Sequence, residues 1–239
     1  MKLMYKRILL KISGEALQGN SSFGIDPKVI GYIAEEIETI LSAGIQVGIV
    51  IGGGNFFRGA TLFDAGLERV TGDHIGILGT MINALAMRDI FERNNIKTRI
   101  MSAVPLGGII DIYDRRRAIY KLEEGKVVIF AGGTGNPLVT TDSALSLRGI
   151  ELKADLLLKA TNVDGIYDSD PRKNPNAVRY KKLTYKEVLE KELAVMDLAA
   201  FSQCRDYKMV LRVFNLYKAG ALRRIIIGED EGTIVQVGE

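Results

Sequence analysis

The stretch VVIFAGGTGNPLVTTDSALSLRG, residues 127–149, carries the pattern that decides the fold. An apolar run of strand length leads into a glycine-rich loop, which is followed by two threonines, an aspartate and a helical segment over Ser143–Arg148. A glycine loop between a strand and the start of a helix is typical of a phosphate site. The lysine that usually completes such a loop is absent, so the positive charge must come from elsewhere in the chain.

The remaining sequence continues this alternation of strand and helix. Pro27–Leu41 predicts a helix, because Asp26 can cap it, a proline occupies its first position and its apolar residues share one face. A second long helix is expected over His74–Arg93. Strands are expected at Arg7–Ile12, Gln46–Ile51, Thr98–Met101, Val127–Phe130, Leu156–Leu158, Arg212–Asn215, Arg224–Ile227 and Thr233–Val237. This order predicts an α/β fold with a mostly parallel sheet that helices cover on both faces.

The composition is that of an ordinary globular chain. Its 239 residues, 47% hydrophobic and 26% charged, suffice for a core, and we expect a single domain over residues 1–239. A net charge of +3 is too small to indicate a nucleic-acid partner. The single cysteine, Cys204, excludes an internal disulfide and fits a reducing compartment. No signal peptide or membrane span is recognisable, so a cytoplasmic location is expected.

The polar segment Asn162–Lys182 interrupts the alternation. It contains two prolines and is too long for a routine connection between elements. It is predicted to be either a functional lid or a disordered insert.

The inventory of reactive side chains excludes several enzyme classes. One histidine, His74, and one cysteine leave no histidine/cysteine metal cluster, and no protein metal ligand is predicted. A Ser–His–Asp or Cys–His hydrolase would have to use His74, which lies in an apolar helical pattern and is better explained by a structural or helix-start role. Neither a GxxxxGK[ST] loop nor a GxGxxG after the first strand is present.

Three glycine-containing loops remain, at residues 11–15, 52–59 and 132–137, and each directly follows an expected strand. The carboxyl ends of parallel strands meet at one edge of the sheet, where ligands bind. One such loop alone has an equally good structural explanation, because turns often need glycine. Three together, with Lys11 and Arg58 inside two of them, favour an anion site. Thr141 or Asp142 can cap the next helix, and Asp142 can also orient Lys11.

Several longer segments resemble the bacterial uridylate kinases, a family within the amino-acid-kinase superfamily. The matching segments are KRILLKISGEAL (6–17), GIQVGIVIGGGNFFRG (44–59), GDHIGILGTMINALAMRD (72–89), AGGTGNPLVTTDSA (131–144), LLKATNVDGIYDSDP (157–171) and VMDLAAFSQCRDYKM (195–209), followed by RVFN and GALRR. The similarity covers nearly the whole chain. It implies a three-layer αβα sandwich, with a lobe over residues 1–160 that binds UMP and phosphates and a lobe over 161–239 that binds the ATP nucleoside.

The resemblance implies transfer of the ATP γ-phosphoryl group to UMP in pyrimidine nucleotide biosynthesis, giving UDP and ADP. The implied catalytic residues are Lys11, Arg58 and Asp142. The residues implied for ATP are Lys11, Ile12, Ser13, Gly14, Gly54, Arg58, Thr161, Asn162, Tyr167 and Asp170. The residues implied for UMP are Gly53, Asp73, Thr134, Gly135, Asn136, Pro137, Leu138, Val139, Thr140 and Thr141. Asp73 is expected to accept hydrogen bonds from ribose hydroxyls, and Asp197 also matches a site region.

The family further implies partners and regulation. Mg²⁺ is expected to be held mainly by nucleotide phosphates and water, because phosphoryl transfer depends on positioning and charge neutralisation. A homohexamer, activation by GTP and inhibition by UTP are also expected. The residues implied for GTP are Gly19, Asn20, Ser21, Ser22, Phe23, Gly24, Arg88 and Arg99. Glu92 and Lys126 replace a histidine and an arginine of related sequences, which weakens the expectation of GTP control.

Two alternatives remain open at this point. A nucleotide-sensing or RNA-binding regulator could use the basic clusters Arg115–Arg117 and Arg172–Lys182, although these lack interleaved aromatic residues and are more typical of solvated faces. Another kinase of the superfamily could act on an amino acid or a carbamate. Asp73 together with the GTGNPLVTTD loop argues against this second alternative.

Overall fold

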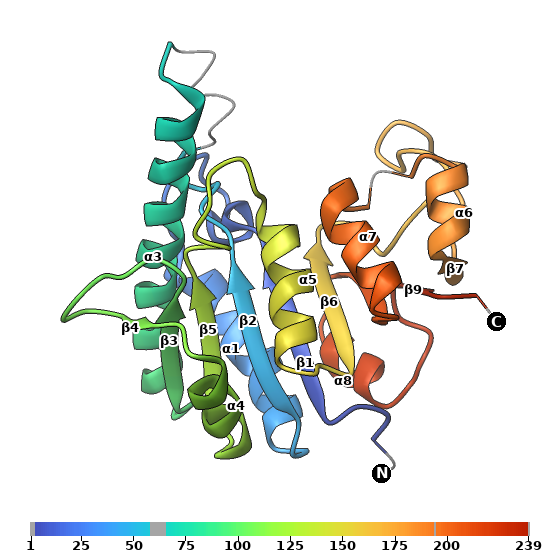
Figure 1. Ribbon diagram of the computed structural model, residues 1–239. Helices are drawn as coiled ribbons and strands as arrows, with labels where there is room; N and C mark the ends of the chain where they lie inside the picture. The colour runs from blue at the N-terminus through green and yellow to red at the C-terminus, as the bar shows by residue number, and fades with distance from the viewer. Residues whose placement is uncertain (1–2, 58–65, 194, 239) are drawn as a thin grey trace.

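The central sheet extends in both directions from β1 (Arg7–Ile12), which lies in its middle. The computed structural model describes residues 3–57, 66–193 and 195–238. Its nine-stranded sheet has the order β4-β3-β5-β2-β1-β6-β8-β9-β7 (Figure 1). Among these described strands every neighbouring pair runs parallel except the antiparallel pair β8–β9. The strands are β2 (Gln46–Ile51), β3 (Thr98–Ser102), β4 (Asp111–Ile112), β5 (Val127–Ala131), β6 (Leu156–Thr161), β7 (Lys182–Thr184), β8 (Leu211–Asn215) and β9 (Thr233–Gln236).

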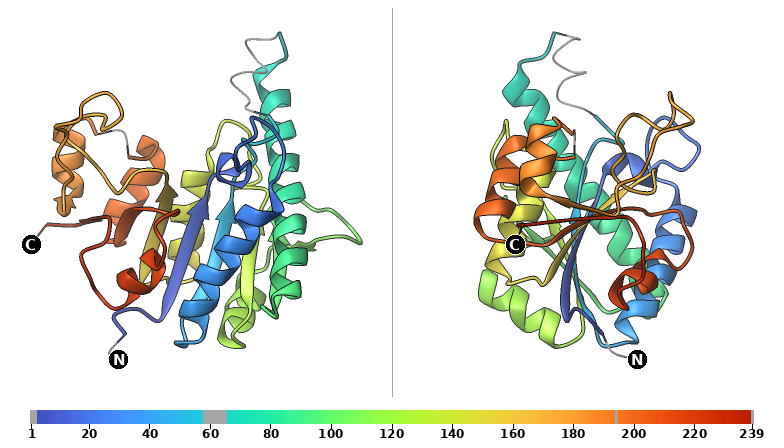
Figure 2. Two further views of the ribbon diagram at one scale, coloured as in Figure 1. Left: turned by 180° about the vertical axis from the view of Figure 1, so that it is seen from behind. Right: turned by 90° about the vertical axis from the view of Figure 1, so that its right-hand side faces the viewer.

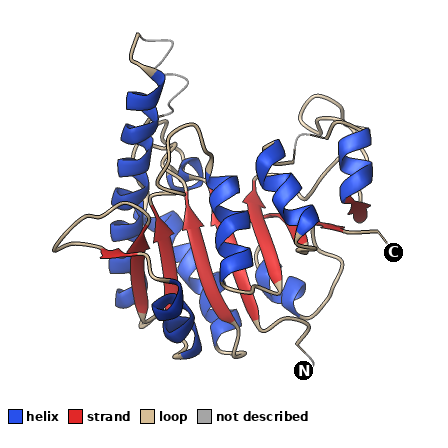
Figure 3. Cartoon of the chain, viewed as in Figure 1, coloured by secondary structure: helices blue, strands red, loops and turns tan. Residues whose placement is uncertain are grey.

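Helices cover both faces of this sheet, which confirms the predicted three-layer αβα sandwich (Figures 2 and 3). One face packs against α1 (Pro27–Leu41), α3 (Arg69–Arg93) and α8 (Ala221–Ile226). The other face packs against α4 (Arg115–Glu123), α5 (Thr141–Glu151), α6 (Tyr185–Glu190) and α7 (Leu198–Asp206). A single turn of 3-10 helix, η1 (Gly14–Leu17), follows β1.

The alternation of side chains along β1 separates two hydrophobic cores. Ile8, Leu10 and Ile12 are fully buried in the core beneath α1, α3 and α8. Leu9 is fully buried in the core beneath α4, α5 and α7. Because side chains of a strand point alternately to the two faces, Lys11 lies on the same face as Leu9, beneath α5.

The helix α1 has the bounds that the sequence predicted. Its N-cap Asp26 accepts a hydrogen bond from the Lys28 backbone nitrogen at 2.9 Å, and Pro27 occupies the first turn. The helix α3 begins at Arg69, five residues before the predicted His74. The start of this helix was harder to predict because no side chain caps it.

The predicted strand over Arg224–Ile227 is wrong, because these residues belong to helix α8. Its buried residues are Ala221, Leu222, Ile225 and Ile226. Residues at these positions lie along one side of a helix, so they form a single apolar stripe. The isoleucine run suggested a strand, since β-branched residues favour strands when nothing else decides.

Three helices that the sequence analysis did not predict each begin at a capping side chain. Asp114, Thr184 and Asp197 accept hydrogen bonds from the backbone nitrogens of Arg117, Glu187 and Ala200 at the starts of α4, α6 and α7. Such caps satisfy donors that the first helical turn leaves unpaired. None of the described helices combines the length and the apolar character that a bilayer crossing requires.

Candidate active site

Two of the three glycine loops lie in direct contact at the carboxyl edge of the sheet. The loops after β1 and β2 are adjacent because these strands pair in parallel, with Ile12 opposite Ile51. A Cβ atom at Gly14 would collide with the side-chain oxygen of Asn55 and the backbone nitrogen of Gly54. Glycine is therefore required at this position, because two backbones approach each other there.

The third loop joins the first two through α3. A Cβ atom at Gly53 would collide with the backbone of Gly76 on α3. One helical turn later, the hydroxyl of Thr80 accepts a hydrogen bond from the backbone nitrogen of Gly132 at 2.7 Å. Gly132 has φ 74°, a conformation that favours glycine. The prediction that the three loops share one edge is confirmed, and α3 holds two of them together.

The positive charge that the third loop lacks comes from two neighbouring strands. Lys11 on β1 and Lys159 on β6 occupy directly paired positions. Their ammonium groups contact the two oxygens of Asp142, with Lys11 Nζ 3.2 Å from Oδ1 and Lys159 Nζ 2.6 Å from Oδ2. The three side chains are only 12–17% exposed. The cluster thus pairs two ammonium groups with one carboxylate, and the Asp197 carboxylate at the first turn of α5 adds a further negative charge near Lys159.

Burial and ion pairing shift the pKa values of Asp142 and Lys159 in opposite directions. Burial alone would raise the pKa of Asp142, but the nearby Lys11 and Lys159 outweigh it and lower that pKa below its usual value. Burial also lowers the pKa of Lys159, while Asp142 opposes this change. Oδ1 of Asp142 accepts no hydrogen bond of good geometry from the described residues. Lys11 is thus the more loosely held of the two lysines.

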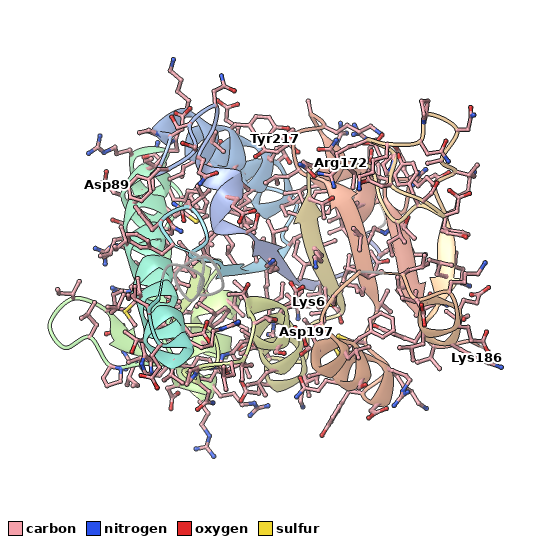
Figure 4. The ribbon with its side chains drawn as sticks, turned by 90° about the horizontal axis from the view of Figure 1, so that it is seen from above. Lys6, Asp89, Arg172, Lys186, Asp197 and Tyr217 are labelled. Atoms are coloured by element: carbon pink, nitrogen blue, oxygen red, sulfur yellow. The ribbon has the colours of Figure 1, made fainter. Side chains whose placement is uncertain are left out.

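The start of α5 differs in one detail from the sequence prediction. Its N-cap is Thr140, not Thr141 or Asp142, since the Thr140 hydroxyl accepts hydrogen bonds from the backbone nitrogens of Asp142 and Ser143. The same hydroxyl donates to Asp197, whose carboxylate also accepts from the Ser143 hydroxyl at 3.1 Å. Asp197, labelled in Figure 4, therefore joins the first turns of α5 and α7 and leaves the Asp142 carboxylate available to the lysines.

A first pocket opens between α3 and the second and third loops. We name it the loop pocket. It is lined by Gly53, Gly54, Phe57, Asp73, Gly76, Ile77, Thr80, Gly132, Gly133, Thr134, Asn136, Val139 and Thr141. Asp73 also accepts a hydrogen bond from the Leu138 backbone nitrogen at 2.9 Å and forms an ion pair with Arg69 at 3.2 Å.

A second pocket lies on the other side of the charged cluster. We name it the segment pocket, because most of its wall comes from the long segment 162–182. It is lined by Lys159, Thr161, Val163, Gly165, Ile166, Tyr167, Asp168, Ser169, Asp170, Pro171, Arg172, Lys191, Glu192, Leu193, Val195 and Val213. The segment is held by a backbone bridge between Tyr167 and Arg179 and by the hydrogen bond from the Ile166 nitrogen to the Thr233 hydroxyl at 2.9 Å.

The structure divides the predicted nucleotide residues between these two pockets. Of the residues expected at UMP, Gly53, Asp73, Thr134, Asn136, Val139 and Thr141 line the loop pocket. Of those expected at ATP, Thr161, Tyr167 and Asp170 line the segment pocket, but Gly54 lines the loop pocket. Lys11, Ile12, Ser13, Gly14 and the exposed Asn162 line neither pocket. Arg58 lies outside the described residues.

Sequence reasoning missed Lys159 and, apart from Asp73, the wall that α3 contributes. A signal for Lys159 was present, because ILLKIS at residues 8–13 and LLLKAT at 156–161 share an apolar run, a lysine and a hydroxyl residue. Two strands of this form that pair in parallel place their lysines side by side. Gly76, Ile77 and Thr80 gave no comparable signal, since an apolar helix face is typical of a core.

The pocket that contains Arg99 does not include the other residues expected at GTP. Arg99 lines an open pocket with Glu92, Asn95, Ile96, Lys97, Thr98 and Lys126. Neither Arg88 nor any residue of 19–24 lines it. The segment 19–24 instead contacts the loop after β2, where the Gly24 backbone nitrogen donates to the Asn55 backbone oxygen at 3.0 Å.

Comparison with known proteins adds a family assignment to this geometry. The sequence profile of the amino acid kinase family matches residues 6–215. The chain belongs to the amino acid kinase family. Among curated members of this family, the chain is 60% identical to a uridylate kinase of Coxiella burnetii over 99% of this chain and 97% of that protein. It is also 60% identical to a uridylate kinase of Marinobacter nauticus over 97% and 96% of the two chains.

Solved structures of the family have the same architecture. A UMP kinase from Bacillus anthracis superimposes with a TM-score of 0.95 at 42% identity, covering 98% of this chain and 97% of that one. A UMP kinase from Ureaplasma parvum gives a TM-score of 0.91 at 36% identity, with 99% and 100% coverage. The predicted amino-acid-kinase fold is confirmed over nearly the full length.

Proposed function

We propose that this chain transfers the γ-phosphoryl group of ATP to UMP, giving ADP and UDP. One observation carries the proposal: a buried cluster of two lysines that share one carboxylate, Lys11–Asp142–Lys159, lies between two pockets where glycine loops meet. Such a centre suits a group that is anionic both before and after its transfer. The uridylate kinase relatives, 60% identical over nearly the whole chain, support the same reaction.

The reaction requires positioning and charge neutralisation more than proton transfer. A phosphate oxygen of UMP attacks the γ-phosphorus of ATP, and the bond between this phosphorus and the oxygen bridging to the β-phosphate breaks. The attacking oxygen is already anionic, so no strong general base is needed. Lys11, the more loosely held lysine, contacts the transferred group, while Lys159 keeps the Asp142 carboxylate neutralised.

In this proposal each pocket holds one nucleotide. UMP occupies the loop pocket, where Asp73 faces the ribose hydroxyls and Thr134 and Asn136 lie near the uracil. ATP places its nucleoside in the segment pocket against Tyr167, and its phosphates reach the loops after β1 and β2. The single domain over residues 1–239 would then work as two lobes that divide near residue 160.

Mg²⁺ is part of the proposal as a companion of the nucleotide. No group of three or more histidine, cysteine, aspartate or glutamate side chains suited to a metal occurs within residues 3–57, 66–193 and 195–238. The buried Asp142 carboxylate is already paired with two lysines. The described side chains therefore fit a Mg²⁺ ion that is held by phosphate oxygens and water. When bound, Mg²⁺ would further neutralise the phosphate charge.

Regulation, assembly and location belong to the same proposal. We infer a homohexamer that acts in the cytoplasm in pyrimidine nucleotide biosynthesis, with UTP as an inhibitor. GTP activation is expected to be weak, since Glu92 brings a carboxylate into the pocket that contains Arg99 and Lys126. A carboxylate repels a triphosphate, whereas the histidine of related sequences does not.

A coupled assay for ADP formation tests the proposed reaction. The purified chain is given ATP and Mg²⁺ with UMP, CMP, AMP, aspartate, acetylglutamate or carbamate as the acceptor. We expect turnover with UMP well above that with every other acceptor. Turnover with an amino acid or carbamate instead would identify a different kinase of the family. Sequence-independent RNA retention on filters, steeply weakened by salt, together with no ADP formation, would identify a nucleic-acid-binding protein.

A further inference from the structure

Two buried asparagines, Asn55 and Asn83, form a reciprocal amide pair beneath the loop pocket. Asn83 is 0% exposed and Asn55 is 1% exposed. Asn55 Nδ2 donates to Asn83 Oδ1 at 2.8 Å, and Asn83 Nδ2 donates to Asn55 Oδ1 at 2.7 Å. Buried amides are costly unless they are hydrogen-bonded, so such a pair remains in a core only when its bonds are made.

The second donor of each amide connects the pair to the backbone of a different segment. Asn83 Nδ2 donates to the carbonyl oxygen of Gly52 at 2.7 Å, and Asn55 Nδ2 donates to the carbonyl oxygen of Gly24 at 2.9 Å. All four amide hydrogens of the pair are therefore used. The pair bonds the loop after β2 to α3 on one side and to the segment before α1 on the other.

This connection joins the two halves of the proposed reaction centre. On the ATP side, the side-chain oxygen of Asn55 lies where Gly14 makes its closest approach to the loop after β2. On the UMP side, α3 carries Asp73, and Thr80, one turn before Asn83, holds Gly132 of the third loop. A change at the amide pair would therefore shift the loop after β2 relative to α3 without removing any side chain that lines either pocket.

We propose that the Asn55–Asn83 amide pair is a positioning element that sets the distance between the phosphate loops and α3, and hence between donor and acceptor. Neither asparagine lines the loop pocket or the segment pocket. The pair acts through the loop after β2 and through α3, which supply Gly53, Gly54 and Thr80 to the loop pocket. This inference rests on the proposed function, because it concerns the alignment of two bound nucleotides.

The physical consequence is a separation between binding and turnover. No lining side chain is lost with the pair, so the KM for ATP should change little. The loop after β2 and α3 both line the loop pocket, so the KM for UMP should change, but less than turnover does. Turnover depends on the alignment of the attacking oxygen with the γ-phosphorus, and a misplacement of about 1 Å can cost on the order of 10²-fold in rate. A residue that only stabilised the fold would instead lower the melting temperature without changing turnover by the folded protein.

The test compares Asn83→Ala and Asn83→Ser with Asn94→Ala in the full chain. Asn94 is the C-cap residue of the same helix, and its exposed side chain donates to the Ile90 carbonyl oxygen at 2.8 Å. Melting temperatures are measured first, and kinetics are then recorded at a temperature where every variant is folded. We expect turnover at saturating ATP and UMP to fall by at least about tenfold for Asn83→Ala and less for Asn83→Ser. The KM for ATP should change by less than about threefold, and the KM for UMP should change less than turnover does.

The outcomes separate this inference from the proposed reaction. A folded Asn83→Ala or Asn83→Ser protein with wild-type turnover, or a loss confined to KM, would overturn the positioning role. An equal loss of turnover in Asn94→Ala would overturn it as well, because any weakening of α3 would then have the same effect. A wild-type chain with no activity on UMP would instead refute the proposed function.

Discussion

The loop pocket and the segment pocket lie on either side of one charged cluster but are built in different ways. The loop pocket is walled largely by glycine backbone, the first turns of α3 and the start of α5. The segment pocket is walled by side chains of a long polar segment, by residues 191–193 and by Val195. In the first, the positions of atoms follow from strand register and from helix–loop contacts. In the second, they follow from hydrogen bonds within an extended connection.

This difference indicates which part of the site must position its nucleotide accurately in the proposed reaction. Backbone nitrogens fixed by a sheet edge are preorganised for phosphate, and they move only if the sheet or α3 moves. The nucleoside of the donor lies far from the transferred group, so its pocket needs affinity more than accuracy. We therefore expect changes at the charged cluster to lower turnover, and changes in the segment pocket to weaken ATP alone.

The largest effect is expected for Lys11→Ala. Turnover should fall by on the order of 10²–10³-fold, since a preorganised charge supplies about 3–4 kcal/mol to a transition state. The free energy of unfolding should change much less, because Asp142 keeps its contact with Lys159 at 2.6 Å. Kinetics and urea unfolding measure the two quantities, with the exposed Lys28→Ala as the control. Near-normal turnover by folded Lys11→Ala would contradict the assigned role.

The double-mutant cycle of Lys11→Ala with Asp142→Asn examines whether the cluster acts as a unit. Asp142→Asn should cut turnover at saturating substrates, because it leaves two neighbouring lysines without a shared counter-charge. The double variant should be little worse than Lys11→Ala alone, since effects of residues that act together are strongly non-additive. Steady-state turnover of the four proteins decides the question. Fully multiplicative losses would mean that the two residues act independently.

A smaller and more selective effect is expected for Asp73→Asn in the loop pocket. The amide has one acceptor oxygen where the carboxylate has two, so UMP affinity should fall by about 1–3 kcal/mol while ATP affinity changes less. Separate titrations with UMP and with an ATP analogue measure both values. Asp89→Asn, an exposed member of an ion pair on the same helix, is the matched control. Equal weakening of both nucleotides would indicate a scaffolding role, in keeping with the bonds from Arg69 and Leu138.

The smallest effect is expected for Tyr167→Ala in the segment pocket. Removal of this ring should raise the KM for ATP several-fold, whereas turnover and the KM for UMP should stay near wild-type values. Initial-rate kinetics with each nucleotide varied in turn provide the measurement. The exposed Tyr207→Ala serves as the control. A fall in turnover comparable to that of Lys11→Ala would remove the proposed contrast between the two pockets.

Sequence reasoning located one side of the site better than the other. The contact between Lys11 and Asp142 was predicted, because glycine loops after parallel strands must meet at one edge of the sheet. Lys159 was missed, since a lysine inside an apolar strand becomes meaningful only once that strand is known to pair with β1. The α3 wall was missed for a related reason: Gly76 and Thr80 act through contacts with loops that are distant in the sequence.

The secondary-structure predictions also succeeded where local residues decide and failed where distant contacts decide. Where local chemistry decides, as at the Asp26 and Pro27 start of α1, the predicted bounds match the structure. Where packing decides, as over Arg224–Ile227, the isoleucine run suggested a strand and the structure has a helix. Helix capping depends on a few adjacent residues and can be predicted from them. The burial of α8 against α1 and β8 depends on residues distant in the sequence and cannot.

The position of β9 in the sheet has a consequence for how the chain is made. β9 lies between β8 and β7, although it is C-terminal to every other described strand. Gly232 and Thr233, at its start, accept the bonds from Arg179 and Ile166 that hold the long segment in place. Translation supplies about 5–20 residues each second, N-terminus first. The ribosome therefore synthesises all residues of the loop pocket several seconds before it synthesises β9. The segment pocket can take its final form only after β9 has been made and has bonded to the long segment.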